Sequence, residues 1–385
     1  MTFVKKIKDE IMEDKNNLFK SFLPNSKYSF NFQSIKKFNN FRKVIVIGMG
    51  GSILGTKAIY SFLKHKIKKK FVFIDNLDQD FLSKIKQECK LAKTLFLIVS
   101  KSGNTNETII NSSYFKFFFK KSNTIIISEN KNNILYKFAK SKGFVFIKHN
   151  PFIGGRYSVF SEVGMLPAYL MGLNPKNFKK NLPKFLNSKK ILSNSIKQLL
   201  KIKIKKFKVV ILFNYVPELN DFLFWLQQLL AESLGKKKKG FIPVVSNAPK
   251  DHHSLLQLYL DGPKDKIFYV FSSKSKKNLK LNCDIFGKEM SYLNKKSYQD
   301  VKVSQKNAFI EILKKNRIPF REIVIKKFDE NTLGKLFLLF IFETIALGKM
   351  MKINPFDQPA VEKVKVLTKK FLISKKSSKK ISERP

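Results

Sequence analysis

Five short apolar runs in the first half of the chain constrain the fold more than any other feature. They span residues 44–47, 71–74, 95–99, 124–127 and 144–147. Most are β-branched or aromatic and lack polar alternation, which is typical of strands buried on both faces. Helical stretches separate them, among them residues 54–64 and 108–119. Strands that alternate with helices predict a parallel, doubly wound α/β sheet.

The same pattern returns in the second half. Predicted strands cover residues 209–213, 243–246, 267–271 and 322–325, and a strongly apolar helix lies around residues 222–230. We therefore expect two α/β domains of similar plan in this chain of 385 residues. The predicted limits are 1–38 for an N-terminal helical arm, 39–166 for the first α/β domain, 167–205 for a helical linker, 206–330 for the second α/β domain, 331–375 for C-terminal helices and 376–385 for a disordered tail.

The formal net charge of +48 raises the question of a nucleic-acid partner. Nearly all basic residues are lysines spread along the whole chain, and only five arginines occur. Arginine is the usual reader of base edges and phosphates, so we predict no specific nucleic-acid partner. The abundant Phe, Ile and Asn share A/T-rich codons with Lys, so we interpret the lysine excess as an effect of genome composition. A polyanion-binding function would rest on charge alone and would be sensitive to salt.

Two features address the cellular setting. Cys89 and Cys283 lie far apart and give neither a metal-binding spacing nor a disulfide framework, which favours a reducing compartment. The N-terminus lacks the apolar run of a signal peptide. The most apolar segment, residues 336–342, is well short of the ~20 residues that span a bilayer. We expect a soluble, cytoplasmic protein without membrane association.

The stretch GMGGSILG, residues 48–55, follows the first predicted strand. Its glycines allow a sharp turn, and the amides of the following helix offer an anion site. A dinucleotide site is an alternative, but the G-x-G-x-x-G pattern needs glycine where Ile53 stands. A tight strand–helix turn without a ligand is a further alternative.

The stretch SKSGNTNET, residues 100–108, follows the third predicted strand. Ligands of such sheets bind outside the carboxyl ends of the strands. Ser100, Ser102 and Thr105 offer hydroxyl donors, and Gly103 permits a tight turn before a helix begins. These groups predict an uncharged cradle for a phosphate. Asn104 or Thr105 could instead be a simple helix cap, although a cap and an anion site can use the same free amides.

Two further positions carry charge suited to proton transfer. Gln228 and Glu232 lie four residues apart on one face of an apolar helix, where the carboxylate could serve as a base. A solvent-exposed glutamate at a helix end is the alternative. Arg156 follows two glycines in a chain that nearly avoids arginine, and its guanidinium could hold developing negative charge.

Histidine and lysine add two more candidates. His252 and His253 are adjacent on a predicted helix, so they point in different directions and form a poor metal pair. One of them could act as an acid or base near neutral pH, or it could be structural. Gln358 and Lys365 lie two turns apart at the start of the last predicted helix.

Taken in order, six stretches resemble the phosphoglucose isomerase family of sugar isomerases. They are GMGGSILG, SKSGNTNET, GGRYSVFSEVGMLPAYLMGLNP, AESLGK, HHSLLQLYLDGP and INPFDQPAVEKVK. The resemblance implies two sugar-isomerase (SIS) α/β domains and a homodimer with active sites at the subunit interface. It implies no metal or cofactor. The implied reaction interconverts glucose 6-phosphate and fructose 6-phosphate in glycolysis and gluconeogenesis, by ring opening and proton transfer through a cis-enediolate.

The resemblance also implies residue roles. Glu232 is similar to the base that moves a proton between C2 and C1, and Arg156 to the arginine beside the enediolate. His253 is similar to the histidine that helps open the sugar ring from the neighbouring subunit, and Lys365 to the lysine that assists at the ring oxygen. The implied substrate contacts are Gly51, Ser52, Ser100, Lys101, Ser102, Gly103, Asn104, Thr105, Gly155, Gln228 and Gln358. The chain departs from the family pattern at Ala360, usually glycine, and at His252, commonly glutamine.

Two other functions stay open at this point. A related isomerase could also accept mannose 6-phosphate. A non-catalytic sugar-phosphate-binding regulator could use the same domains, although no helix-turn-helix segment is evident. The presence of Glu232, His253, Arg156 and Lys365 together favours catalysis.

Overall fold

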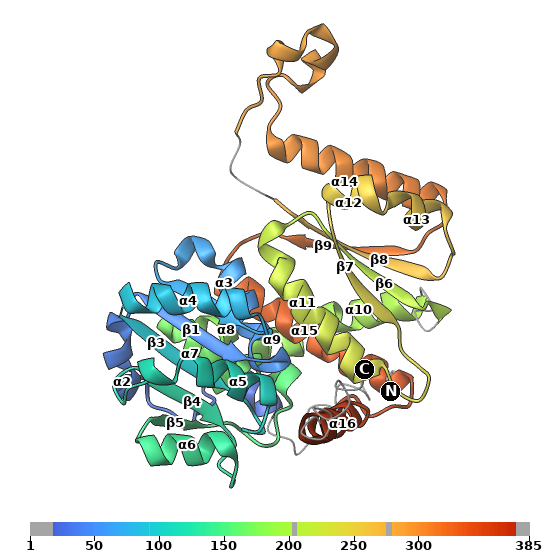
Figure 1. The fold of residues 1–385 in the computed structure, drawn as a ribbon. Helices are drawn as coiled ribbons and strands as arrows, with labels where there is room; N and C mark the ends of the chain where they lie inside the picture. The colour runs from blue at the N-terminus through green and yellow to red at the C-terminus, as the bar shows by residue number, and fades with distance from the viewer. Residues whose placement is uncertain (1–17, 92, 202–205, 275–278, 375–385) are drawn as a thin grey trace, which may run out of the picture.

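The computed structural model describes residues 18–91, 93–201, 206–274 and 279–374 of an α/β protein with two parallel sheets (Figure 1). The first sheet has the strand order β2-β1-β3-β4-β5 and the second β7-β6-β8-β9. The strands are β1 Lys43–Gly48, β2 Lys70–Ile74, β3 Thr94–Val99, β4 Thr124–Ser128, β5 Val145–Lys148, β6 Val209–Asn214, β7 Ile242–Asn247, β8 Lys266–Ser273 and β9 Phe320–Ile325. All nine predicted strands are present, and the predicted fold class is confirmed.

Both faces of the first sheet are covered, which explains its unbroken apolar runs. Val44 and Val46 of β1 belong to a core that includes α3 and α7. Ile45 and Ile47 point the other way and pack with residues of α4 and α6. The helices of this half are α2 Phe32–Ile35, α3 Leu54–Phe62, α4 Gln79–Leu91, α5 Asn106–Tyr114, α6 Ile134–Lys142 and α7 Glu162–Leu170.

The second sheet is covered in the same way. Val210 and Leu212 of β6 pack with residues of α11 and α15, whereas Ile211 and Phe213 pack with residues of α13 and α14. The helices of this half are α8 Pro175–Lys179, α9 Leu182–Asn187, α10 Lys189–Lys201, α11 Asn220–Leu234, α12 Lys250–Ser254, α13 Leu256–Asp261, α14 Tyr298–Lys315, α15 Glu330–Met350 and α16 Val361–Ser374.

Helix α11 joins the two halves, since its apolar residues share one continuous core with α3, α7 and α15. The Trp225 ring lies edge-on to Phe337 of α15, with ring centroids 4.6 Å apart. Because α11 starts after β6 and runs back towards the start of β7, its last turn lies at the amino end of the second sheet. That turn faces the carboxyl end of the first sheet, as the contacts described below show.

A buried ion pair ties α10, β9 and α15 together. The Arg321 guanidinium lies 2.8 Å from a carboxylate oxygen of Glu343, and it also donates to the Ser195 hydroxyl. Both charged side chains are almost fully buried. Removal of either partner would leave an uncompensated buried charge and would cost about 3–5 kcal/mol of stability.

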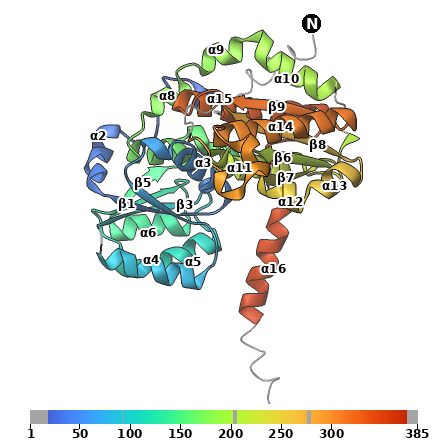
Figure 2. The same cartoon turned by 90° about the horizontal axis from the view of Figure 1, so that it is seen from above.

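The C-terminal helices behave as two separate units. Helix α15 is buried along most of its length, whereas α16 is exposed and projects away from the two sheets (Figure 2). In the described part of the chain, no helix combines the length and apolar character needed to cross a membrane. Residues 1–17 of the predicted arm and the predicted tail 376–385 lie outside the described residues, and the predicted domain limits remain predictions.

Candidate active site

The glycine-rich turn after β1 makes close contact with two other segments. It forms a short 3-10 helix, η3 (Gly50–Ser52). A Cβ added to Gly51 would lie 2.2 Å from the carbonyl carbon of Gly155, and one added to Gly50 would lie 2.7 Å from the amide nitrogen of Gln228. The glycines are therefore required because protein atoms approach the turn closely. The same packing brings β1, the Gly155 turn and α11 to one place.

Arg156 lies where the turn after β1, the Gly155 turn and α11 meet, and it is only 2% exposed. It is the second residue of the 3-10 helix η6 (Gly155–Phe160). A guanidinium has five N–H donors, and here all five are used. The acceptors are Ser233 Oγ (2.8 Å), Glu232 Oε2 (3.2 Å), Gln358 Oε1 (2.6 Å), Pro355 O (2.6 Å) and Asp357 O (3.1 Å). The predicted cation is thus rigidly fixed beside the predicted base.

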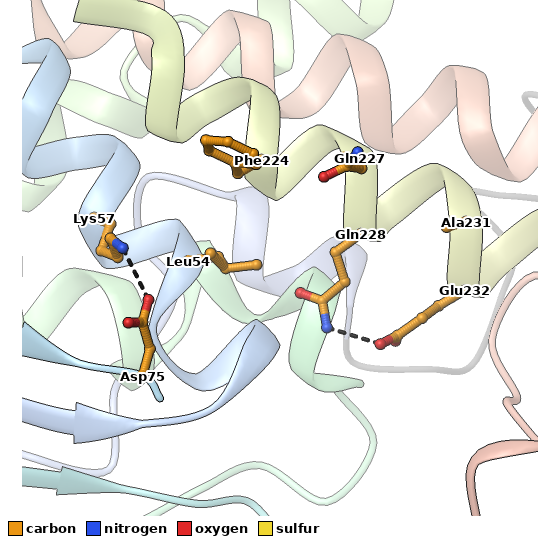
Figure 3. Close-up of a pocket in the computed structure, with 8 residues that line it drawn as sticks. All are labelled: Leu54, Lys57, Asp75, Phe224, Gln227, Gln228, Ala231 and Glu232. Carbon is orange, nitrogen blue, oxygen red and sulfur yellow. Dashed lines mark hydrogen bonds and ion pairs between the residues drawn. The ribbon is translucent and has the colours of Figure 1, made fainter. Parts of the chain in front are cut away.

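Glu232 lies in the last turn of α11 and its side chain is 28% exposed. Its Oε1 accepts a hydrogen bond from the Gln228 amide at 2.8 Å, as the four-residue spacing predicted (Figure 3). The Gln228 oxygen is buried and has no hydrogen-bond partner among the described residues. A buried acceptor without a partner is costly, so this oxygen is suited to accept a hydroxyl hydrogen from a ligand.

Two hollows meet at Glu232. One, of about 500 Å³, lies between α3 and α11 and is also lined by the Lys57–Asp75 ion pair (Figure 3). The other, of about 560 Å³, lies between the end of α11 and the segment that carries Gln358. A carboxylate open to both is accessible to a small molecule while its other side is held by Arg156.

The predicted phosphate cradle forms a cluster of hydroxyls. Ser100 Oγ lies 2.8 Å from Thr105 Oγ1, and Ser102 Oγ lies 3.5 Å from the same atom. Thr105 occupies the N-cap position of α5, as one of the alternatives predicted, but its side chain makes no capping bond. The hydroxyls therefore gather at a helix N-terminus, where free amides favour an anion.

The rest of this loop is braced against α6. Asn104 does not cap its own helix, because its side-chain oxygen accepts the Ile134 amide at the start of α6. Gly103 has φ of +65°, and an added Cβ would lie 1.9 Å from Asn133 Oδ1. The Lys101 ammonium is engaged elsewhere, donating to the Pro151 carbonyl at 2.7 Å. Burial lowers the Lys101 pKa.

The hydroxyl cluster and Glu232 lie along one continuous edge. β1 and β3 are neighbours, and a Cβ added to Gly48 would lie 3.0 Å from the Val99 carbonyl, just before Ser100, and 3.3 Å from the Ser52 Cβ. The turn that holds Ser52 also contacts Gln228, which bonds to Glu232. The carboxyl end of the first sheet therefore carries both the cradle and the approach to the carboxylate.

The two histidines differ in their surroundings. His252 is half-buried, stacks on Phe213 and bonds to the Tyr215 hydroxyl through Nε2 at 2.7 Å. Burial lowers its pKa. His253 is exposed on α12. Helix α12 follows the carboxyl end of β7, and His252 packs on the face of the second sheet opposite α11, so His253 and Glu232 of one chain are far apart.

The last predicted pair is divided. Gln358 contacts Arg156, whereas Lys365 is an exposed residue of α16. This helix projects away from the two sheets (Figure 2). Among the described residues, no group of three or more His, Cys, Asp or Glu side chains is arranged to hold a metal ion.

Residues that the sequence did not single out hold Arg156 and Gln358 in place. The Ser233 hydroxyl bonds to Arg156 and to the Tyr157 hydroxyl, and the Trp225 indole donates to the Arg156 carbonyl at 3.1 Å. Lys236 donates to the Asn354 carbonyl and to the Asp357 carboxylate at 2.6 Å. Ser233 and Lys236 lie within the stretch AESLGK and Tyr157 within GGRYSVFSEVGMLPAYLMGLNP, but nothing in the sequence indicates what their side chains bond to.

Comparisons with known proteins agree with this arrangement. In fold, the chain is similar to a hypothetical protein of Thermus thermophilus, with a TM-score of 0.85 and 23% identity over 96% of this chain and 94% of the other. It is also similar in fold to a glucose-6-phosphate isomerase from Chlamydia trachomatis, with a TM-score of 0.74 and 20% identity over 90% of this chain and 72% of the other. The chain thus shares its fold with solved proteins, among them a glucose-6-phosphate isomerase.

In sequence, the chain matches the family described as Phosphoglucose isomerase over residues 28–384. It is 33% identical to the glucose-6-phosphate isomerase of Methanocaldococcus jannaschii, over 88% of this chain and 86% of that relative. It is 31% identical to the glucose-6-phosphate isomerase of Campylobacter jejuni, over 86% of both. The chain belongs to the phosphoglucose isomerase family.

Proposed function

We propose that the protein interconverts glucose 6-phosphate and fructose 6-phosphate. The observation that carries this proposal is one carboxylate, Glu232, held by Arg156 and Gln228 on the edge that also bears the hydroxyls of residues 100–105. Aldose–ketose isomerisation needs one base for one proton and an anchor for the distant phosphate. Relatives named glucose-6-phosphate isomerase support the same substrate pair.

Glu232 serves as the base of the proton transfer. Its carboxylate takes the proton from C2 of the open-chain aldose, and the electron pair left behind forms a cis-enediolate. The same carboxylate then returns the proton to C1, while O2 loses its hydroxyl proton to become the ketone oxygen and O1 gains one to become a hydroxyl. The 28% exposure of the side chain leaves it accessible to the sugar. A positioned base contributes roughly 10²–10⁴-fold to rate.

Arg156 stabilises the enediolate. All five of its donors bond to protein acceptors, so the anionic oxygen must replace one of these acceptors. Gln358 is the exposed acceptor on Nη1, and a charged oxygen is a stronger acceptor than its neutral amide. The exchange favours the transition state over the ground state, because the sugar oxygen becomes fully charged only then.

The hydroxyls of Ser100, Ser102 and Thr105 bind the phosphate together with the free amides of α5. Uncharged donors suit a dianion without competing for the transferred proton. Binding energy gained at the phosphate holds the reacting carbons against Glu232, so that the proton transfer takes place between groups already fixed in position. A charged hexose phosphate crosses bilayers poorly, which supports a cytoplasmic reaction.

The complete site requires a second subunit in this proposal. His253 is exposed and lies across the second sheet from Glu232 of its own chain. We infer a homodimer in which His253 of each chain helps to open the sugar ring in its neighbour's site, and in which α16 brings Lys365 to the ring oxygen. The exposed apolar residues of α16, Val364, Leu367 and Phe371 among them, support burial in such an assembly.

A coupled assay tests the function directly. Purified protein is mixed with fructose 6-phosphate in the presence of a chelator, and glucose 6-phosphate is followed through its dehydrogenase. We expect steady turnover that depends on protein concentration. A preparation that binds fructose 6-phosphate but forms no glucose 6-phosphate, alone or with an added divalent metal, would contradict the proposal and favour a sugar-phosphate-binding regulator. Mannose 6-phosphate in the same assay measures specificity.

A further inference from the structure

A separate polar hollow of about 190 Å³ lies at the carboxyl end of the second sheet. Tyr215, which follows β6, and the pair Ser272 and Ser273, which ends β8, form one wall. Lys274 completes this wall, and Lys302 and Lys306 of α14 form the opposite one (Figure 1 shows α14 above β8 and β9). None of its lining residues is acidic. The site around Glu232 does not include this hollow.

The hollow occupies the position in the second domain that the phosphate cradle occupies in the first. β3 pairs with β1 and β4, and β8 pairs with β6 and β9 in the same parallel sense. Helix α5 connects β3 to β4, and α14 connects β8 to β9. Residues 272–274 (SSK) therefore correspond to residues 100–102 (SKS) by topology. Ligands of open α/β sheets bind at such strand ends.

The charges around the hollow are unbalanced. The Lys306 ammonium pairs with Glu322 at 2.7 Å. The ammonium groups of Lys274 and Lys302 have no ion-pair or hydrogen-bond partner among the described residues. The acidic group in the first turn of α14 is Asp300, which is used to cap the helix by accepting from Ser297. The Ser297 hydroxyl in turn accepts the Asp300 amide, so attraction for an anion comes from the two lysines and the Ser272 hydroxyl rather than from the helix end.

We propose that this hollow is a second anion site, which binds a phosphate group. Its volume corresponds to about six water molecules, enough for a tetrahedral dianion with part of its hydration shell but not for a whole buried hexose phosphate. Two unpaired ammonium groups match the charge of a phosphate dianion. The Ser272 hydroxyl, on the face of β8 that carries Phe268 and Val270 and packs against α14, can donate to a further oxygen. Inorganic phosphate and the phosphate end of a sugar phosphate share this chemistry.

Occupancy of the hollow would act on the helix that carries His253. Tyr215 lines the hollow and its hydroxyl bonds to His252 at 2.7 Å, one residue before His253. An anion that contacts Tyr215 would therefore act on α12 through this bond. This consequence rests on the proposed role of His253, whereas the anion site itself does not.

Binding stoichiometry tests the site independently of catalysis. Radiolabelled inorganic phosphate is measured by equilibrium dialysis at constant ionic strength. We expect two phosphates per chain for the wild type and one for Lys274→Gln/Lys302→Gln. We also expect one for Ser102→Ala/Thr105→Ala, and two for the control Lys84→Gln/Lys315→Gln, which removes two exposed lysines elsewhere. One phosphate per chain in the wild type, or an equal loss in the control, would overturn the proposal, the latter because it would reflect general charge.

Two further arms identify the ligand and its effect. If unlabelled fructose 6-phosphate displaces both phosphates, the ligand of the second site is a sugar phosphate. If it displaces only one, the ligand of the second site is inorganic phosphate. Phosphate that binds only the catalytic site raises KM alone. An effect through α12 would change kcat about twofold or more in the wild type and not in Lys274→Gln/Lys302→Gln or Tyr215→Phe. An unchanged kcat with two bound phosphates would remove the coupling to His253.

Discussion

Replacement of Glu232 by glutamine tests the proposed base with little change in the shape of the site. The amide is similar in size to the carboxylate but cannot accept a proton near neutral pH. General-base catalysis contributes roughly 10²–10⁴-fold, so we expect kcat to fall by about that factor. This loss corresponds to about 2.7–5.4 kcal/mol of activation free energy.

The effect of the same substitution on folding should be smaller. Glu232 accepts hydrogen bonds from two donors, the Gln228 amide and the Arg156 guanidinium. Glutamine offers one acceptor oxygen, so one donor loses its partner. Because the Glu232 side chain is 28% exposed, water can replace part of that bond, and we expect the free energy of unfolding to fall by about 1 kcal/mol. The kinetic loss should therefore exceed the loss of stability.

Transfer of solvent deuterium to C1 of fructose 6-phosphate reports the proton transfer itself. Glu218→Gln is a matched control, because Glu218 is an exposed glutamate in the turn just before α11. The control should exchange deuterium as the wild type does. If folded Glu232→Gln exchanges within about tenfold of the wild type, its loss is below the range for general-base catalysis, and Glu232 is not the base.

Three further outcomes follow from the same contacts. Ser102→Ala/Thr105→Ala should raise KM for fructose 6-phosphate by about 10²-fold with little change in kcat, because two hydrogen bonds to a charged group are lost. An unchanged KM would count against the phosphate cradle. Lys236→Met should lower kcat/KM by about tenfold, because Asn354 and Asp357 lose their partner beside Gln358. Lys236→Arg should restore most of kcat/KM. Equal losses in both variants would contradict a positioning role for Lys236. Burial lowers the pKa of His149 to about 4 in the folded chain, whereas the ordinary value is about 6.5. As pH falls, His149 of the unfolded chain therefore binds a proton before that of the folded chain, and stability is lost between about pH 6.5 and pH 4. Between pH 7 and pH 5 the wild type should lose about 2 kcal/mol more than His149→Gln in urea unfolding, and equal losses would show that His149 is not the cause.

The sequence by itself determined the two sheets and several local contacts of the candidate site. All nine strands were predictable, because strands buried on both faces must be apolar throughout. An apolar run can be recognised in the sequence without knowledge of how the strands pair. The motif 100–105 was predictable for the same local reason: hydroxyls and a glycine at a strand end form a turn whose groups face a neighbouring helix N-terminus. The spacing of Gln228 and Glu232 likewise fixed their bond, since residues four apart share one helix face.

Only the tertiary structure decided how the parts meet. The five acceptors of Arg156 come from two distant segments, residues 232–233 and 355–358, and no local pattern joins them. The distance between His253 and Glu232 depends on which face of the second sheet each helix covers, which is set by packing of the whole core. The Lys101 ammonium bonds to the Pro151 carbonyl for a similar reason, because folding brings these two segments, fifty residues apart in the sequence, next to each other. Residues that are neighbours in the sequence determine local contacts, whereas contacts between distant segments depend on the packing that brings them together.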